Sequence, residues 1–143
     1  MRTSALLAAL LALAACRGVD AEAPDGFAAF DDWHRFRAVS ADGVMYMVRA
    51  EDNDPEAKLE FWKEALKNRM KDAGYAFVTE EDIKGKQPGY LLELAAPVGE
   101  QDYSYMVAVF VRGGDVVIAE ASGEVTHFAG RRGAIVAALG KIE

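Results

Sequence analysis

Apolar and polar positions along the chain follow two periodicities, one typical of helices and one typical of strands. The most regular run predicts a helix over 55–73, because its apolar residues recur every three or four positions. Asp54 and Pro55 are favoured at a helix start, and Gly74 is favoured just past a helix end. The apolar stripe of this helix consists of Leu59, Trp62, Leu66, Met70 and Ala73.

Alternating residues, or short apolar runs bounded by turn signals, predict about six strands. An alternating run at 33–39 and an apolar run at 44–48 flank a turn signal at 40–43. A second helix is predicted over 124–139, with Phe128, Ile135 and Leu139 on one face. The order β-β-α-β-β-β-β-α predicts an α+β fold, an antiparallel sheet of about six strands with the two helices covering both faces. The remaining strands are expected at 75–79, 90–96, 103–111 and 116–121.

The first fifteen residues have the pattern of an export signal. Arg2 precedes an uncharged apolar run of twelve residues, 4–15, which is shorter than the ~20 residues that span a bilayer as a helix. The sequence Leu13-Ala14-Ala15-Cys16 then resembles the lipobox of bacterial lipoproteins. That resemblance implies cleavage before Cys16, the chain's only cysteine, and attachment of lipid to it. An ordinary secretory signal cleaved after Ala21 is the alternative.

These features predict a division into a signal peptide (1–15), a lipidated cysteine with a tether (16–29) and a single α+β domain (30–143). With 16 basic and 23 acidic residues the chain has a net charge of −7, so an anionic lipid surface does not attract it. Lipid must therefore hold it, and two or more acyl chains hold a protein firmly. In the Gram-negative lipoproteins that this segment resembles, an Asp after the cysteine favours retention in the inner membrane, and this chain has Arg17 there. We therefore expect a protein anchored in the cell envelope, at the outer membrane and facing the periplasm if the host is Gram-negative.

Composition and the absence of known motifs argue against several classes of function. The acidic balance argues against nucleic-acid binding, and a single cysteine excludes an internal disulfide and a cysteine-based zinc site. Neither histidine is placed in a hydrolase motif with a serine, and no Gly-rich loop is followed by the Lys-Ser/Thr of a phosphate site. We therefore predict no enzyme activity and no cofactor.

Three acidic clusters are candidate metal or catalytic sites. Asp31, Asp32 and His34 could hold a metal ion, although a polar strand edge explains them better. The acids at 51–54 could bind Ca²⁺, but helix capping accounts for them more simply. The acids at 80–82 could be paired carboxylates of a glycosidase, but a solvated strand end is the plainer interpretation. No metal site is therefore predicted.

The order of elements, with a few aromatic and glycine positions, resembles the PsbP-like and DcrB-like superfamily over about 30–140. The resemblance implies an antiparallel sheet between helices in an extracytoplasmic accessory or assembly factor. It carries no shared catalytic residues. The positions behind it are Asp42-Gly43, Phe61-Trp62, Gly74-Tyr75, Glu120-Ala121-Ser122-Gly123, Phe128 and Ile135.

The predicted function is non-enzymatic: a membrane-anchored lipoprotein domain that binds an envelope protein or assists assembly. Tyr103 and Tyr105 share a strand face with Val107 and form an aromatic patch if no helix covers them. Arg131 and Arg132 on the last helix could contact an anionic partner, or simply be solvated. The alternative function is small-molecule binding in a pocket between helix and sheet, near Trp62 and Tyr105.

Overall fold

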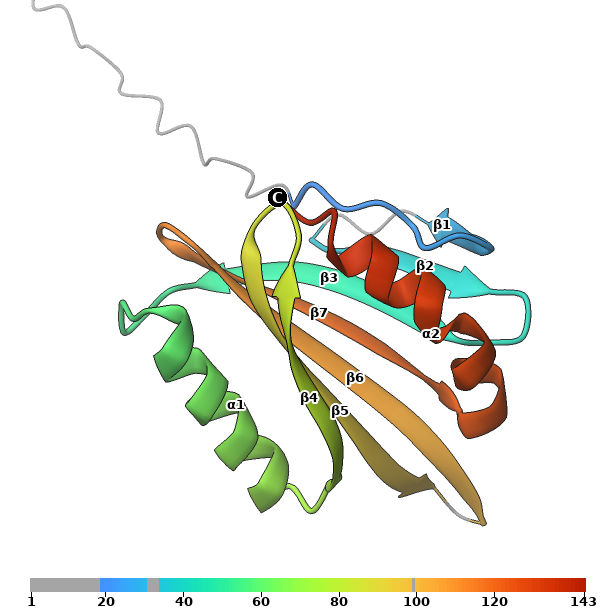
Figure 1. Ribbon diagram of the computed structural model, residues 1–143. Coiled ribbons are helices and arrows are strands. Elements are labelled where there is room, and N and C mark those ends of the chain that lie inside the picture. Colours follow the sequence, from blue (N-terminus) through green and yellow to red (C-terminus); the bar gives the residue numbers. More distant parts are fainter. Residues whose placement is uncertain (1–18, 31–33, 99) are drawn as a thin grey trace, which may run out of the picture.

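The computed structural model describes residues 19–30, 34–98 and 100–143, and these form one seven-stranded antiparallel sheet with two helices (Figure 1). The strand order is β1-β2-β3-β7-β6-β5-β4. The predicted α+β class is confirmed. The elements are β1 (Phe27–Phe30), β2 (Phe36–Ser40), β3 (Met45–Asp52), α1 (Leu59–Asp72), β4 (Ala76–Lys84), β5 (Pro88–Val98), β6 (Gln101–Arg112), β7 (Asp115–Glu124) and α2 (Val125–Leu139).

Each helix covers one face of the sheet, as expected from strands that are apolar on both faces. The larger core lies under α2, where Tyr46, Phe110 and Phe128 are fully buried. The smaller core lies under α1 and contains Leu92, Val107 and their neighbours on β5, β6 and β7. α2 buries four side chains, whereas none on α1 is fully buried. No helix among the described residues is long and apolar enough to cross a membrane.

The structure contains a strand, β1, that the sequence analysis did not predict. β1 pairs with β2 in a stretch expected to be tether, and Phe27 lies opposite Ser40. Before it, Val19, Ala21 and Ala23 pack against the core under α2. Short alanine-rich strands carry little local signal, because their pairing depends on a neighbouring edge rather than on side-chain pattern.

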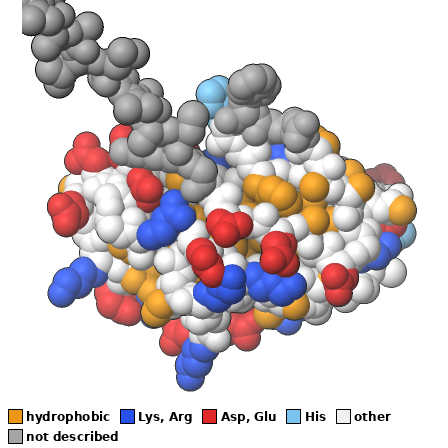
Figure 2. Space-filling view, turned by 90° about the horizontal axis from the view of Figure 1, so that it is seen from above, with side chains coloured by type: hydrophobic (Ala, Val, Ile, Leu, Met, Phe, Trp, Pro, Cys, Tyr) orange, Lys and Arg blue, Asp and Glu red, His pale blue; other side chains and the backbone are white. Residues whose placement is uncertain are grey.

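The segment that precedes β1 is fixed to the carboxyl-terminal end of the chain. The Glu143 amide donates to the Asp20 carbonyl at 3.5 Å, and Lys141 lies 3.1 Å from Glu22. Lys86, in the β4–β5 loop, forms an ion pair with Glu143 and donates its amide to the Gly140 carbonyl at 3.0 Å. Figure 2 looks onto this end of the molecule and shows acidic and basic side chains interspersed. The described chain is therefore part of the folded body from Val19 onward.

The prediction that Asp54 and Pro55 begin the first helix is wrong. α1 begins at Leu59, and the residue at its amino-terminal cap position, Lys58, has no side-chain capping bond. The preceding loop is instead held by the buried Asn53, whose amide side chain accepts from the Ala57 amide at 3.1 Å and donates to the Ala57 carbonyl at 3.0 Å. The end of the helix is as predicted, because Gly74 has φ +85° and the last turn closes on Met70 and Lys71.

β4 is slightly longer than the predicted strand, which begins at 75–79 and ends in the acidic residues 80–82. It continues through the acidic residues 80–82 to Lys84, and Ile83 returns to the core under α2. Consecutive side chains of a strand point to opposite faces, and both faces of this edge strand are open to solvent at 80–82, so the run of acids does not end it. These acids are solvated, as predicted, but the strand ends at Lys84 rather than within them.

Candidate functional site

A groove runs between α1 and the sheet. Its cavity measures about 260 Å³. Val107, Val109, Val116 and Ile118 form an apolar floor on β6 and β7. Trp62, Ala65, Leu66 and Arg69 of α1 form one wall, and Glu51 and Asp52 of β3 form the other.

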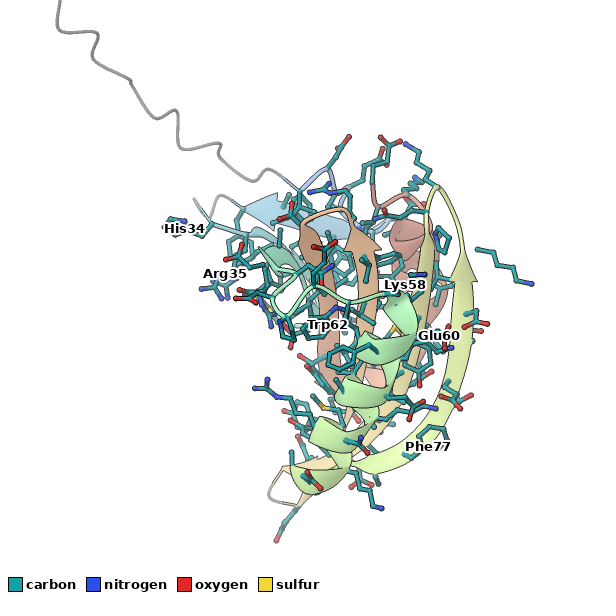
Figure 3. All side chains as sticks on the ribbon, turned by 90° about the vertical axis from the view of Figure 1, so that its left-hand side faces the viewer. His34, Arg35, Lys58, Glu60, Trp62 and Phe77 are labelled. Carbon is teal, nitrogen blue, oxygen red and sulfur yellow. The ribbon has the colours of Figure 1, made fainter. Side chains whose placement is uncertain are left out.

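The wall of the groove is positioned by the helix stripe seen in the sequence. Leu59, Trp62, Leu66 and Met70 all pack against the core under α1. Trp62 also donates its indole Nε1–H to the Asn53 Oδ1 at 2.8 Å, which fixes the ring against the sheet (Figure 3). The indole therefore presents its apolar surface to the groove while its polar atom is satisfied.

A polar cluster lies beyond the groove on the same face of the sheet. Arg49 of β3 forms an ion pair with Glu120 of β7 and lies 3.1 Å from Glu51. Tyr105 of β6 donates its hydroxyl to Glu120 and packs on Tyr75, with ring centroids 5.3 Å apart. Burial, and then the hydrogen bond to Glu120, raise the pKa of the Tyr105 phenol. The Tyr105 phenol is therefore neutral and donates its hydrogen bond to Glu120.

α1 packs on β5 and β6, and the β1–β3 part of the same face has no helix over it in the described structure. The register places Phe30, Arg37 and Met47 in one row across three strands, and Val39 and Met45 in the next row. The row that starts at Phe30 continues through Glu120 to Val107 of the α1 core. We call these five residues, Phe30, Arg37, Val39, Met45 and Met47, the open sheet face.

The open sheet face combines apolar and cationic groups. The Arg37 guanidinium lies 5.0 Å from the centroid of the Phe30 ring, and Arg35 Nη1 lies 3.5 Å from the Met47 sulfur. Phe30 is 40% exposed, while Arg37, Val39, Met45 and Met47 are half-buried. Methionine, aromatic and arginine side chains are the types enriched in protein–protein interfaces.

The structure separates the site residues predicted from sequence. Trp62 and Tyr105 lie on the α1 face, and Trp62 lines the groove whereas Tyr105 is outside its lining. Arg131 and Arg132 lie on α2, and each forms an ion pair with a carboxylate from another element of the chain. Arg131 is 3.3 Å from Asp42, and Arg132 is 3.0 Å from Glu93.

Tyr103 is half-buried and lines a second groove near Arg132, beside β4. Cys16 and the metal candidates Asp31 and Asp32 fall outside the described residues, and His34 is exposed.

The described residues contain no group of three histidine, cysteine or acidic side chains placed to hold a metal ion. Ser40 donates its hydroxyl to Asp42 and accepts the Val44 amide at 2.9 Å, so it belongs to the β2–β3 turn. His127 lies 3.8 Å from Asp42. In a hydrolase triad the serine hydroxyl donates to the histidine, and this serine donates to the carboxylate instead.

Comparison with known proteins shows likeness at the level of fold. No family model matches the chain, and no curated protein matches it. The solved structures that are similar include PA94 from Pseudomonas aeruginosa, a protein of unknown function considered a candidate regulator. It is 13% identical with a TM-score of 0.63 and covers 78% of this chain and 83% of its own.

A second similar structure is cyanobacterial PsbP, CyanoP, from Synechocystis. It is 12% identical with a TM-score of 0.55 and covers 85% of this chain and 83% of its own. The PsbP-like resemblance is confirmed as a likeness of fold. At this identity the likeness carries no function to the chain.

Sequence reasoning missed the open sheet face. Four of its five residues, all but Phe30, alternate along 36–48 with buried residues, and the pattern did predict strands there. Which half of a sheet face a helix covers depends on strand order, and the sequence did not reveal that β7 inserts between β3 and β6. An excess of Met and Arg on one strand face is the signal that could have identified it.

Proposed function

We propose that this chain is a lipoprotein of the cell envelope, anchored through lipid on Cys16, whose domain binds another envelope protein and catalyses no reaction. The anchor rests on the sequence Leu13-Ala14-Ala15-Cys16. The binding role rests on one observation, the open sheet face, where Met, Phe and Arg side chains lie half-exposed beside the groove. The likeness of fold to PsbP is compatible with an accessory role.

An in-cell cross-linking experiment tests this role. A photo-reactive phenylalanine analogue placed at Met47 of the full-length chain should capture one recurrent envelope protein, because a side chain at that position contacts whatever covers the face. The matched control carries the analogue at Glu64, which is exposed on α1. Capture should be absent at Glu64 and lost when Cys16→Ala is added. Equal capture at both positions, or none at Met47, would contradict the proposal.

A second candidate function is small-molecule binding in the groove between α1 and the sheet, favoured by its apolar floor and the charged Arg69, Glu51 and Asp52 at its rim. Its volume suits a small apolar group rather than a large cofactor. Anilinonaphthalene sulfonate, which carries both an apolar ring system and an anionic group, should quench Trp62 emission at saturable concentrations. Val109→Trp, which fills the groove floor, should abolish that saturation. Quenching unchanged in Val109→Trp would rule the groove out.

A further inference from the structure

β4 is an edge strand with an exposed apolar beginning. In the described sheet it pairs with β5, and its other side has no strand beside it. Phe77 is 60% exposed and Val78 is 55% exposed, and Figure 3 shows Phe77 on the outer side of the strand. An edge strand presents unpaired amide and carbonyl groups that can pair with another extended chain.

Two grooves flank this same beginning of β4, one on each face of the sheet. The groove on the α1 side measures about 310 Å³ and is lined by Met70, Tyr75, Phe77, Leu92 and Leu94, together with charged residues at its rim. The groove on the α2 side measures about 480 Å³, and its apolar lining includes Ala76, Val78, Ala95, Val125 and Phe128. Side chains of a strand point alternately to the two faces of a sheet. A strand added to β4 would therefore place successive side chains in the two grooves.

The charges further along β4 indicate what kind of strand fits. Glu80, Glu81 and Asp82 follow the apolar part, and their side chains are 40%, 49% and 66% exposed. Each already has an exposed or half-exposed cation nearby, Lys67, Arg132 or Lys63, and such surface pairs are weak enough to be shared. Asp102 adds a further exposed acid to the α2-side groove.

A second copy of this chain is a poor occupant. Antiparallel pairing of β4 with β4 of another copy, centred on Glu80, would set the residues of the acidic run 80–82 opposite or diagonal to one another. Like charges directly opposite in neighbouring strands are destabilising. A strand with basic residues opposite these acids and apolar residues opposite 76–78 has the complementary pattern.

The position of this edge also excludes the chain's own amino-terminal segment, which would carry the lipid, as an occupant. β4 ends at Lys84, next to the loop that contacts Gly140 and Glu143, where residues 20–22 are also fixed. Its beginning lies eight residues away, or about 27 Å at the rise of a strand. If Cys16 carries lipid, only two residues separate it from the fixed segment at Val19, so the apolar end of β4 faces away from the membrane.

We propose that the beginning of β4 is a docking site for an extended segment of a partner protein. In antiparallel orientation the segment carries basic residues first and apolar residues after them. Backbone hydrogen bonds to the β4 edge hold the segment, and the two grooves bind its alternate side chains. The inference rests on the proposed binding function but uses a different surface from the open sheet face.

Peptide binding by the full chain, purified in mild detergent, tests the inference. The probe is a fluorescein-labelled peptide, Lys-Arg-Lys-Thr-Val-Phe-Val, followed by anisotropy. We expect saturable binding that Val78→Asp and Phe77→Ser each weaken about tenfold or more. Phe61→Ser is the matched control, because Phe61 is 49% exposed but lies on α1. It should bind as the unchanged chain does.

Two further peptides test the charge and apolar parts separately. Replacing the three basic residues with Glu-Asp-Glu, or the apolar residues with serine, should abolish measurable binding. No binding of the probe, equal binding of the acidic peptide, or binding unchanged in Val78→Asp would each overturn the inference. A dimer measured by light scattering that Phe77→Ser dissociates would also overturn it, in favour of a second copy. Cross-linking at Met47 reports on the other surface, so failure of this site and failure of the proposed function are distinguishable.

Discussion

Asn53→Ala is expected to lower the free energy of unfolding by about 3 kcal/mol. The Asn53 side chain is 8% exposed and makes four hydrogen bonds. They join three separate segments: the loop before α1 at Ala57, the indole of Trp62, and the Gly113 carbonyl in the β6–β7 turn, which is 3.3 Å away. Alanine leaves those partners without a bond in a half-buried site, and such groups cost free energy when unpaired.

Chemical denaturation followed by far-UV circular dichroism measures this loss. Asn68→Ala is the matched control, because Asn68 is exposed on α1 and alanine has the higher helix propensity. That variant should be unchanged or slightly more stable. A loss below about 1 kcal/mol for Asn53→Ala would mean that the loop before α1 is held by other contacts.

Cys16→Ala is expected to move the protein from the membrane fraction to the soluble fraction. The full chain has a net charge of −7, so anionic lipid does not retain it once the acyl chains are absent. Fractionation after an alkaline wash measures the effect, and mass spectrometry of the amino-terminal peptide of the unchanged protein should show the acyl mass on Cys16.

Ser4→Ala changes the same amino-terminal segment without touching the cysteine and should stay in the membrane fraction. Retention of Cys16→Ala in the washed membrane would show that the anchor is something other than lipid on that thiol. Release of the unchanged protein by the wash would show that lipid does not anchor it to the membrane.

Periodicity predicted the helices and strands that have one buried face, because that face is visible in their own sequence. The stripe from Leu59 to Met70 placed α1, and alternation at 103–111 placed β6. The start of α1 was misplaced because Asn53 binds groups 60 residues away at Gly113, and this tertiary contact replaced the local cap at Asp54.

The candidate site was less predictable because it depends on contacts distant in sequence. Arg131 and Arg132 resembled a free cationic pair, yet their carboxylates are 89 and 39 residues away, at Asp42 and Glu93. The unpaired edge at β4 and the uncovered half of the α1 face follow from strand order. No local pattern encodes strand order, which is decided by the packing of the whole sheet.

Because α1 buries fewer side chains than α2, it can move away from the sheet more easily. No side chain of α1 is fully buried, whereas α2 buries Phe128, Ile135, Ala138 and Leu139. Local opening costs least where few apolar contacts are lost, so α1 can lift from β5 and β6 while the larger core under α2 stays closed. The groove at Trp62 can therefore widen at a lower cost in free energy than the core under α2 can open.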